Sequence, residues 1–430
     1  MSKLPLEGIR VIDHGVAYTG PGATSMLGDM GAEVIRVESI RRFPTMVRGM
    51  VARPVREGVE KYPGYADNDP GSRPWDRWWQ HHALNRNKYG ITLDLSRPKG
   101  VEIYKKLVKI SDVVIENFSQ GVMDKLGIGY AFHKGVKPDI IMISTSGLGD
   151  EGPYKGYSTF GSNIDSVTGM MSLRGYPGDD MMIRNPMPVW SDNVAAATAA
   201  FAAMVSIYYR NRTGKGQFVD LSQVESFLPH MGESIMEYTM NGRVPLPMGN
   251  RDSSMAPHGC YPCRGEDKWV VIAVSSDKEW QALCRAMGEP KWAKGKKFTT
   301  VSGRWHNQDE LDGHISRWTK VRDNYEVMHL LQKEGVPAGV VTTPIELYED
   351  FHLKERNFFV EATHREIGTC VYPGMFFKFS RTPARIRILP NLLREHNDYV
   401  YGEILGMSRE EIAQLEEEKL IGDAYLPEVP

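Results

Sequence analysis

Long hydrophobic runs are missing from this chain. The longest apolar stretch, from Val194 to Tyr209, is interrupted by Thr198 and Ser206, whereas a membrane-spanning helix needs about 18 to 20 consecutive apolar residues. The first residues also lack the apolar core of a secretory signal peptide. We therefore expect a cytoplasmic protein that does not bind membranes.

Cysteine is scarce as well, with four among 430 residues. Cys260 and Cys263 form a CxxC motif, but no second pair of ligands lies at the spacing of a zinc site, and Cys284 and Cys370 are distant in the sequence. This pattern predicts reduced thiols, with neither a disulfide framework nor a bound metal.

Other absences narrow the function. The formal net charge is only -2, so no overall attraction to nucleic acid is expected. The turn Gly20-Pro21-Gly22 fits neither the GxGxxG nor the GxxxxGK[ST] phosphate-binding pattern. The GxSxG pattern of a nucleophilic serine is also absent.

What is present is an alternation of strands and helices. A β-branched run at residues 9–13, a helix from Gly20 to Met30 that Gly31 ends, and a second run at 33–38 form a βαβ unit. Further strands are expected at residues 91–95, 112–118, 139–145 and 218–221. We therefore predict an α/β fold with a parallel sheet, whose ligand site lies beyond the carboxyl ends of the strands.

Asp192 stands where a short extended segment from residue 187 turns into a helix of small apolar residues that runs to Arg210. We expect this helix to be buried. Asp192 has two readings, which the local pattern leaves open: a carboxylate that caps the helix N-terminus, or a catalytic carboxylate at the edge of a pocket.

Two other candidates have simpler interpretations. Asp165, four residues before Gly169, is interpreted as part of a polar helix face, and the His81-His82 pair as core or surface histidines rather than metal ligands. From residue 245 the composition shifts to Pro, Gly and Met, and residues 255–335 indicate a smaller α+β unit. A strand at 340–342 is expected to begin a return segment.

Several motifs follow one another at the spacing of a known family. In one-letter code they are LEGIRVID at 6–13, GP at 20–21, LGDMGAEVIRVE at 27–38, NRNK at 85–88, DVVIENF at 112–118, GPY at 152–154 and RTGKGQ at 212–217. The chain resembles, over nearly its whole length, the class III CoA-transferases of the formyl-CoA transferase and carnitine CoA-transferase type. The resemblance implies a large Rossmann-like domain built from both chain ends, a smaller middle domain, and two protomers interlocked like chain links.

This organisation gives the expected domain bounds. Residues 1–225 are expected to form the first part of the Rossmann-like CoA-binding domain, 226–335 a linker and the small α+β domain, and 336–430 a return segment that completes the large domain. The partner protomer is expected to be a second copy of the chain, or a paralogous subunit of a heteromer.

The resemblance also implies a mechanism. In that family an aspartate at the start of a helix attacks an acyl-CoA thioester, and Asp192 falls on this position. Coenzyme A enters as the acyl-CoA substrate, and no tightly bound cofactor is expected. Because an anhydride intermediate hydrolyses in water, the site must be closed, and Gly249-Asn250-Arg251 are the expected lid.

The same resemblance assigns the contacts to coenzyme A. The matching positions are Ala17, Tyr18, Asn117, Phe118, Lys125 and Leu126, with Lys125 in place of the arginine of formyl-CoA transferase. Ser39 and Ser96 stand where that enzyme has basic phosphate contacts, and Arg41, Arg42 or Arg97 are expected to compensate.

Two alternatives share the fold. The α-methylacyl-CoA racemases pair the aspartate with an upstream His-Asp, which falls on Phe160 and Gly161 here, so a two-base racemase is disfavoured. A partner subunit of a heteromeric transferase is the other alternative.

The substrate is predicted only in outline. Arginines between Arg41 and Arg56, with Arg184, suit an acid with an extra carboxylate. The side chains that suit an aromatic or apolar body are Trp75, Trp78, Trp79, Met181, Met182 and Met187. The expectation is transfer from succinyl-CoA to a dicarboxylate, for instance benzylsuccinate.

Overall fold

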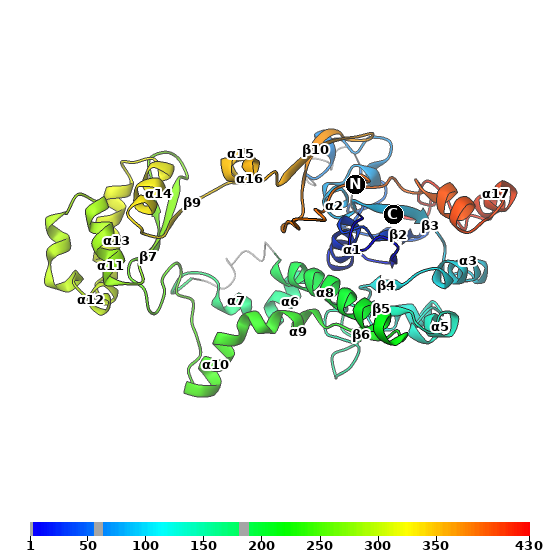
Figure 1. Cartoon of the computed structure of the whole chain (residues 1–430), viewed down its shortest axis with the longest axis horizontal. Helices are drawn as coiled ribbons and strands as arrows, with labels where there is room; N and C mark the ends of the chain where they lie inside the picture. Colours follow the sequence, from blue (N-terminus) through cyan, green and yellow to red (C-terminus); the bar gives the residue numbers. More distant parts are fainter. Residues whose placement is uncertain (1–2, 56–62, 180–188) are drawn as a thin grey trace. The chain divides into compact units, whose positions relative to one another are not determined.

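The computed structural model describes residues 3–55, 63–179 and 189–430 of the chain (Figure 1). The chain forms two compact units. The first comprises Met1–Gly169, Pro186–Ile235 and Glu355–Pro430, and the second comprises Met170–Asn185 and Met236–Lys354. Each unit has its own hydrophobic core.

A parallel sheet of six strands forms the centre of the first unit. Its strands are β1 (Arg10–Asp13), β2 (Glu33–Glu38), β3 (Lys88–Thr92), β4 (Val113–Glu116), β5 (Ile141–Ser144) and β6 (Phe218–Asp220). The strand order is β3-β2-β1-β4-β5-β6, and every pair is parallel. The predicted α/β fold is thereby confirmed. The order reverses between β1 and β4, so a crevice is expected beyond their carboxyl ends.

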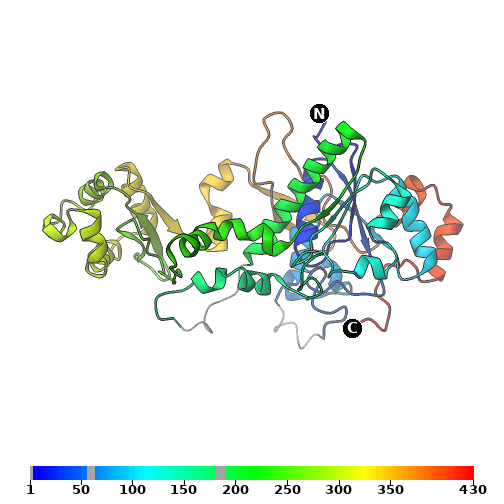
Figure 2. The same ribbon diagram turned by 90° about the horizontal axis from the view of Figure 1, so that it is seen from below.

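Helices cover both faces of this sheet (Figure 2). On one face α1 (Thr19–Asp29) and α8 (Trp190–Thr213) pack with Val11, Val34 and Ile115. On the other face α3 (Pro98–Lys109), α5 (Tyr130–Val136) and α17 (Arg409–Glu417) pack with Ile12 and Val114. Neighbouring strand residues thus face opposite layers, as the pleat of a strand requires.

The third strand lies three residues earlier than predicted. We expected residues 91–95, but β3 is Lys88–Thr92. The difference arises because Lys88 is fully buried and paired with Asp13 of β1. A charged side chain at a strand start breaks the apolar pattern on which the prediction rested.

The second unit contains an antiparallel sheet in the order β7-β8-β9, formed by β7 (His258–Pro262), β8 (Trp269–Ala273) and β9 (Ala338–Val341). Residues 340–342 were expected to begin the return segment. Instead β9 pairs with β8, and the chain re-enters the first unit at Glu355. The helices around this sheet are α11 (Asp277–Ala286), α12 (Val301–His306), α13 (Gln308–Thr319) and α14 (Asn324–Lys333).

The remaining elements are short. They are α2 (Trp79–Leu84), α4 (Val122–Lys125), α6 (Gly161–Val167), α7 (Met170–Leu173), α9 (Gln223–Phe227), α10 (Gly232–Asn241), α15 (Pro344–Glu349), α16 (Phe351–Glu355), the hairpin β10 (Phe359–His364) and β11 (Gly368–Pro373), and the π-helix η8 (Asp398–Ile404). A 3-10 turn at Leu228–Met231 separates α9 from α10. Pro229 lacks the N–H that a continuous helix needs there. Among the described residues, no helix has the length and hydropathy needed to cross a membrane.

Candidate active site

The segment that joins β1 to α1 lies at the carboxyl ends of β1 and β4, where the strand order predicts a crevice. Asn117, just after β4, binds both backbone groups of Val16: its Oδ1 accepts the Val16 N–H at 2.7 Å and its Nδ2 donates to the Val16 carbonyl at 2.8 Å. Ala17 follows with φ 52°, a left-handed conformation that costs a non-glycine residue free energy. Three of the expected CoA contacts, Ala17 and Tyr18 in this segment and Asn117 after β4, therefore lie close together at this end of the sheet.

Buried charges hold the base of this segment. Asp13 Oδ1 accepts the Gly15 N–H at 2.7 Å, and Asp13 Oδ2 lies 2.9 Å from Lys88 Nζ and 3.3 Å from Arg36. Burial alone would raise the pKa of Asp13, but the charges of Lys88 and Arg36 lower it to about 2. The Asp13 carboxylate therefore stays ionised and keeps the loop in place.

Asp192 lies in the first turn of α8, beside the start of α1. Its Oδ1 accepts a hydrogen bond of 3.0 Å from the Thr19 hydroxyl, and Thr19 is fully buried. Burial raises the pKa of Asp192, the Thr19 hydrogen bond lowers it, and the charge of Asp165 raises it. Burial also raises the pKa of Tyr18, and the negative charge of Asp192 adds to this rise. The expected nucleophile and an expected CoA contact thus lie close enough to interact.

Gly161, the first residue of α6, packs directly against Asp192. A Cβ at this position would lie 2.4 Å from Asp192 Oδ2 and 2.1 Å from Val189 Cγ1. Only glycine fits there without a shift of its neighbours. This is the position at which the racemases carry the second residue of their His-Asp pair, so the structure has no room for that side chain beside Asp192.

The cap of α8 comes from Asp165, not from Asp192. Asp165 is fully buried in α6, and its two carboxylate oxygens accept the backbone N–H groups of Trp190 at 3.2 Å and Ser191 at 3.1 Å. The expectation of a polar helix face at Asp165 was wrong, and so was the capping interpretation of Asp192. Asp165 therefore frees the Asp192 side chain from capping.

The burial expected for α8 holds for one face only. Ala195, Ala196, Ala199 and Ala203 are buried against the sheet, whereas Phe201 is 69% exposed. The solvent-facing apolar side chains of α8 are Trp190, Phe201, Met204, Val205, Tyr208 and Tyr209.

Two of the three arginines expected at the CoA phosphates already have partners in the chain. Arg41 Nε donates to Asp94 at 2.6 Å, and Arg97 donates to the Glu418 carbonyl at 2.7 Å. Lys125, at the end of α4, is exposed and takes part in no ion pair within the described residues. Arg42 is exposed as well. Of the expected basic contacts, Lys125 and Arg42 therefore both lack an ion-pair partner among the described residues.

Arg48 and Arg53, in the 41–56 loop, are structural. Arg48 is fully buried between Glu38 and Asp76, and Arg53 donates to backbone carbonyls near the chain end. Trp75 and Trp78 are buried, and Trp79 is 53% exposed. The expected substrate contacts that lie outside the described residues are Arg56, Met181, Met182, Arg184 and Met187.

The remaining candidates lie elsewhere. His81 and His82 are buried and bonded to the carbonyls of Asn391 and Asp76, as core histidines are. The expected lid residues Asn250 and Arg251 lie in the second unit, where Arg251 pairs with Asp309 and Asp312.

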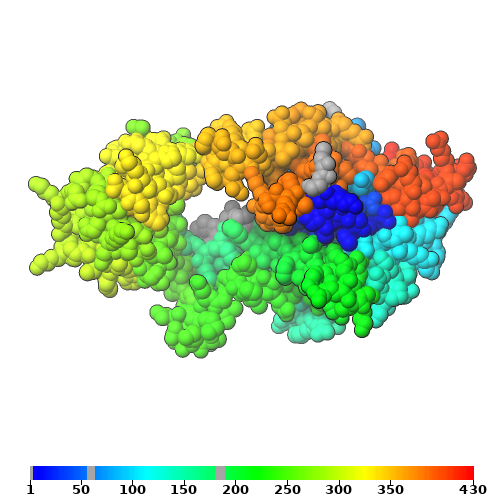
Figure 3. All heavy atoms as spheres, viewed as in Figure 1, coloured from blue at the N-terminus to red at the C-terminus, as the bar shows by residue number. Residues whose placement is uncertain are grey.

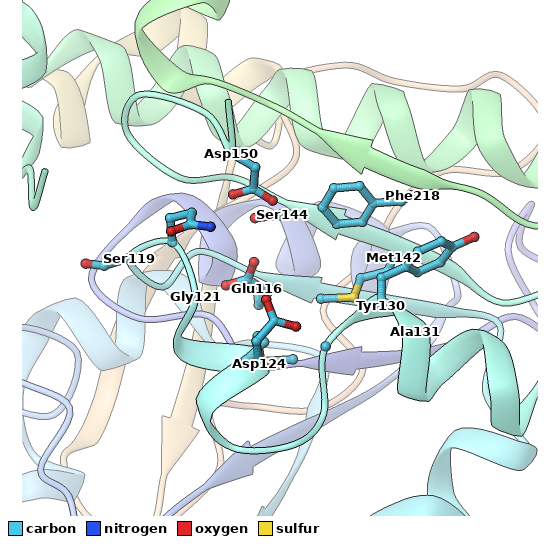
Figure 4. Close-up of a pocket in the computed structure, with 13 residues that line it drawn as sticks. Glu116, Ser119, Gly121, Asp124, Tyr130, Ala131, Met142, Ser144, Asp150 and Phe218 are labelled. Atoms are coloured by element: carbon cyan, nitrogen blue, oxygen red, sulfur yellow. The ribbon is translucent and has the colours of Figure 1, made fainter. Parts of the chain in front are cut away.

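Phe118 and Leu126, the other expected CoA contacts, are partly buried and pack against the core beside α3. A cavity of about 230 Å³ opens near them, at the carboxyl ends of β4 and β5 (Figure 4). Three acidic side chains, Glu116, Asp124 and Asp150, line it. Burial raises the pKa of Glu116 to about 7, although Glu116 Oε2 accepts the Phe118 N–H at 2.7 Å. None of the predicted site residues lines this cavity, and no sequence pattern had marked Glu116.

Comparison with known proteins identifies the family. Residues 6–397 match CoA-transferase family III. The chain is 32% identical over 418 residues, 97% of this chain and 98% of the other, to succinyl-CoA–D-citramalate CoA-transferase of Chloroflexus aurantiacus. It is 28% identical over 409 residues, 95% of this chain and 97% of the other, to succinate–glutarate CoA-transferase of Agrobacterium fabrum. The solved structure of a CAIB/BAIF family protein from Brucella suis has a TM-score of 0.80 at 28% identity, covering 94% of this chain and all of that one.

These matches cover nearly the whole length of the chain and of its relatives. The fold and the comparisons together define a CoA-transferring enzyme. The chain belongs to CoA-transferase family III, which confirms the resemblance to the class III CoA-transferases.

Proposed function

We propose that this enzyme moves coenzyme A from succinyl-CoA to a dicarboxylic acid, with Asp192 as the covalent nucleophile. The observation that carries the proposal is the placement of the Asp192 carboxylate. The carboxylate is largely buried beside the segment that joins β1 to α1 and accepts a hydrogen bond from Thr19. It does not cap α8, because Asp165 does so. Its raised pKa favours nucleophilic attack, because basicity and nucleophilicity rise together.

The proposed reaction has four covalent steps. The Asp192 carboxylate attacks the thioester carbonyl, which forms a mixed anhydride and releases the CoA thiolate. The thiolate attacks the Asp192 carbonyl, so that an aspartyl-CoA thioester forms and succinate leaves. The acceptor carboxylate then attacks this thioester and releases the thiolate again. Finally the thiolate attacks the acceptor acyl group of the new anhydride and restores the Asp192 carboxylate.

The neighbours of Asp192 suit these steps. The Thr19 hydroxyl can hold one carboxylate oxygen while the other attacks. The Asn117-anchored segment with Ala17 and Tyr18 is proposed to receive the thiol end of coenzyme A, and Phe118, Lys125 and Leu126 its nucleotide end. Arg41 and Arg97 are secondary candidates for the phosphates, since each must share its charge with a protein partner.

The substrate class rests on the relatives. Those named above act, by name, on D-citramalate and on succinate and glutarate, and a 30% identical relative is the alpha subunit of a succinyl-CoA–L-malate CoA-transferase. A succinyl donor and a four- or five-carbon dicarboxylate acceptor are therefore proposed. Benzylsuccinate stays a candidate acceptor on the sequence expectation alone.

A partner protomer is part of the proposal. Several apolar side chains of α8, the helix drawn in green in Figure 3, face solvent, and such a group of exposed apolar side chains suits a contact with another protein. A second copy of the chain is the proposed partner. A paralogous subunit is the alternative, because the malate relatives in Chloroflexus aurantiacus have alpha and beta subunits.

The test combines an acceptor panel with variants of Asp192. The wild-type protein is incubated with succinyl-CoA and D-citramalate, L-malate, glutarate, benzylsuccinate or acetate, and new CoA esters are separated by chromatography. We expect transfer to at least one dicarboxylate and little to acetate. Asp192→Ala and the isosteric Asp192→Asn are expected to keep the fold, measured by circular dichroism, and to lose transfer.

Hydroxylamine adds a direct readout of the intermediate. It should convert the aspartyl-CoA thioester to a hydroxamate of Asp192. Mass spectrometry should find this hydroxamate on the Asp192 peptide only after incubation with succinyl-CoA. Normal turnover in Asp192→Ala, or a label on another carboxylate, would overturn the mechanism. Transfer confined to monocarboxylates would overturn the substrate class.

A further inference from the structure

Asp165 ties α6 to the first turn of α8, the turn that carries Asp192. Both oxygens of its carboxylate are used, one for the Trp190 N–H and the other for the Ser191 N–H. The Ser191 hydroxyl adds a third link, since it donates to the Gly161 carbonyl at 3.3 Å. The residues immediately before Asp192 are thus fixed from α6 rather than from within α8.

This arrangement is unusual for a helix start. The residue before α8 is Val189, which has no side-chain group to cap the helix. Without Asp165 the N–H groups of Trp190 and Ser191 would be left without a partner, and an uncapped first turn frays. The Asp192 side chain leaves the helix from that turn, so its direction toward Thr19 depends on the turn being closed.

The Asp165 charge has a second consequence. Asp165 is fully buried and lies at the N-terminus of α8, where the helix dipole favours a negative charge. Its charge also acts on Asp192, where it favours the protonated form and makes the carboxylate more basic. The other titratable group that faces Asp192 is Tyr18, from the segment before α1.

We infer that Asp165 is the positioning residue of the nucleophile: it holds the first turn of α8 so that the Asp192 carboxylate meets Thr19 on one side and Gly161 on the other. The inference rests on the proposed function of Asp192. By this inference α6 supports acyl transfer, a role that the sequence around Asp165 does not indicate.

The first variant is Asp165→Asn, which keeps one acceptor oxygen and removes the charge. We expect kcat to fall about 10- to 100-fold, because misplacement of a reacting group by about 1 Å can cost 100-fold, while KM for succinyl-CoA changes less than about threefold. The acid limb of the kcat–pH profile should move to lower pH, since the charge that raises the pKa of Asp192 is gone. Asp165→Glu keeps the charge and should leave this limb in place while kcat falls.

A matched control separates positioning from stability. Asp323 caps α14 in the second unit through the N–H groups of Tyr325 and Glu326. Asp323→Asn should lower the melting temperature without a change in kcat or in the pH profile. If Asp165→Asn has wild-type kcat, or if Asp165 variants lose stability while kcat and the pH limb stay unchanged, Asp165 is only a structural cap and the inference is wrong.

The two proposals fail in different ways. If the proposed mechanism is wrong, Asp192→Ala still transfers coenzyme A, whatever the Asp165 variants show. Where Asp165→Asn is too unstable for kinetics, Asp165→Glu tests the positioning role instead. The yield of Asp192 hydroxamate after one turnover is then measured in this variant and in the wild type. A yield equal to that of the wild type would overturn the positioning role.

Discussion

The Thr19 hydroxyl and the Asp192 carboxylate, 173 residues apart in the sequence, meet in a hydrogen bond of 3.0 Å. The contact joins the starts of α1 and α8, the two helices that pack side by side on one face of the sheet (Figure 1). Thr19 belongs to the segment that follows β1, so the nucleophile and the proposed CoA-binding loop are fixed to each other. Substitutions at this contact should therefore change acyl transfer more than they change the fold.

Thr19→Val removes the hydroxyl and keeps the shape of the side chain. The Asp192 carboxylate loses the contact that orients it, and misplacement of a reacting group by about 1 Å can cost 100-fold, so kcat should fall roughly tenfold even though the carboxylate becomes more basic. Because the lost bond favours the charged form of Asp192, the pKa of Asp192 should rise and the acid limb of the kcat–pH profile should move to higher pH. This is the opposite of the shift expected for Asp165→Asn. Thr19→Ser, which keeps the hydroxyl, is the control, and equal profiles for the two variants would refute the role of the bond.

Gly161→Ala places a methyl group where Asp192 Oδ2 and Val189 Cγ1 now lie. The neighbours must move, and overpacking of this kind typically costs about 1 to 3 kcal/mol. We expect a lower melting temperature and a loss of transfer activity larger than the loss of stability, because the displaced group is the proposed nucleophile. Gly156→Ala is the matched control, since a Cβ there meets no atom within 4 Å. Wild-type kinetics in Gly161→Ala would show that the contact is not needed.

The sequence predicted the elements whose signals are local. The strand expected at 33–38 is β2 itself, because a β-branched run follows the glycine that ends α1. The place of Asp192 at a helix start was also predicted, from the small apolar residues that follow it. The proposals that Asp192 is catalytic and that the residues around it contact coenzyme A came from family motifs and not from physical pattern.

What the sequence could not predict depends on contacts between distant segments. The capping of α8 comes from Asp165, and nothing near residue 190 indicates that a helix 25 residues earlier supplies it. Lys88 looks like a surface lysine, yet it is buried against Asp13, 75 residues away. The arginines of the 41–56 loop suggested an anion site, but Arg48 neutralises Glu38 and Asp76 inside the core. A cluster of charged residues in a sequence does not indicate whether these charges pair with a ligand or with other residues of the protein.

Glu116 provides a prediction about stability and pH. Its side chain is buried at the end of β4, and burial raises its pKa to about 7 from an ordinary value near 4.5. The folded protein therefore binds more protons at this group than the unfolded chain does between these two values, so the group makes the free energy of unfolding fall as pH rises through this window. Asp124 and Asp150, across the cavity, add to the effect (Figure 4).

Glu116→Gln removes the ionisable group and keeps its shape. The variant should be more stable than the wild type at pH 8, by roughly 1 to 3 kcal/mol, and the difference should shrink toward pH 5, where Glu116 is protonated in the folded protein. Thermal unfolding at half-unit pH steps measures it. Glu102→Gln, at a side chain 71% exposed, is the control and should show no such trend. A stability difference that is constant with pH, or that grows toward acid, would mean that burial does not raise the pKa of Glu116 in the folded protein.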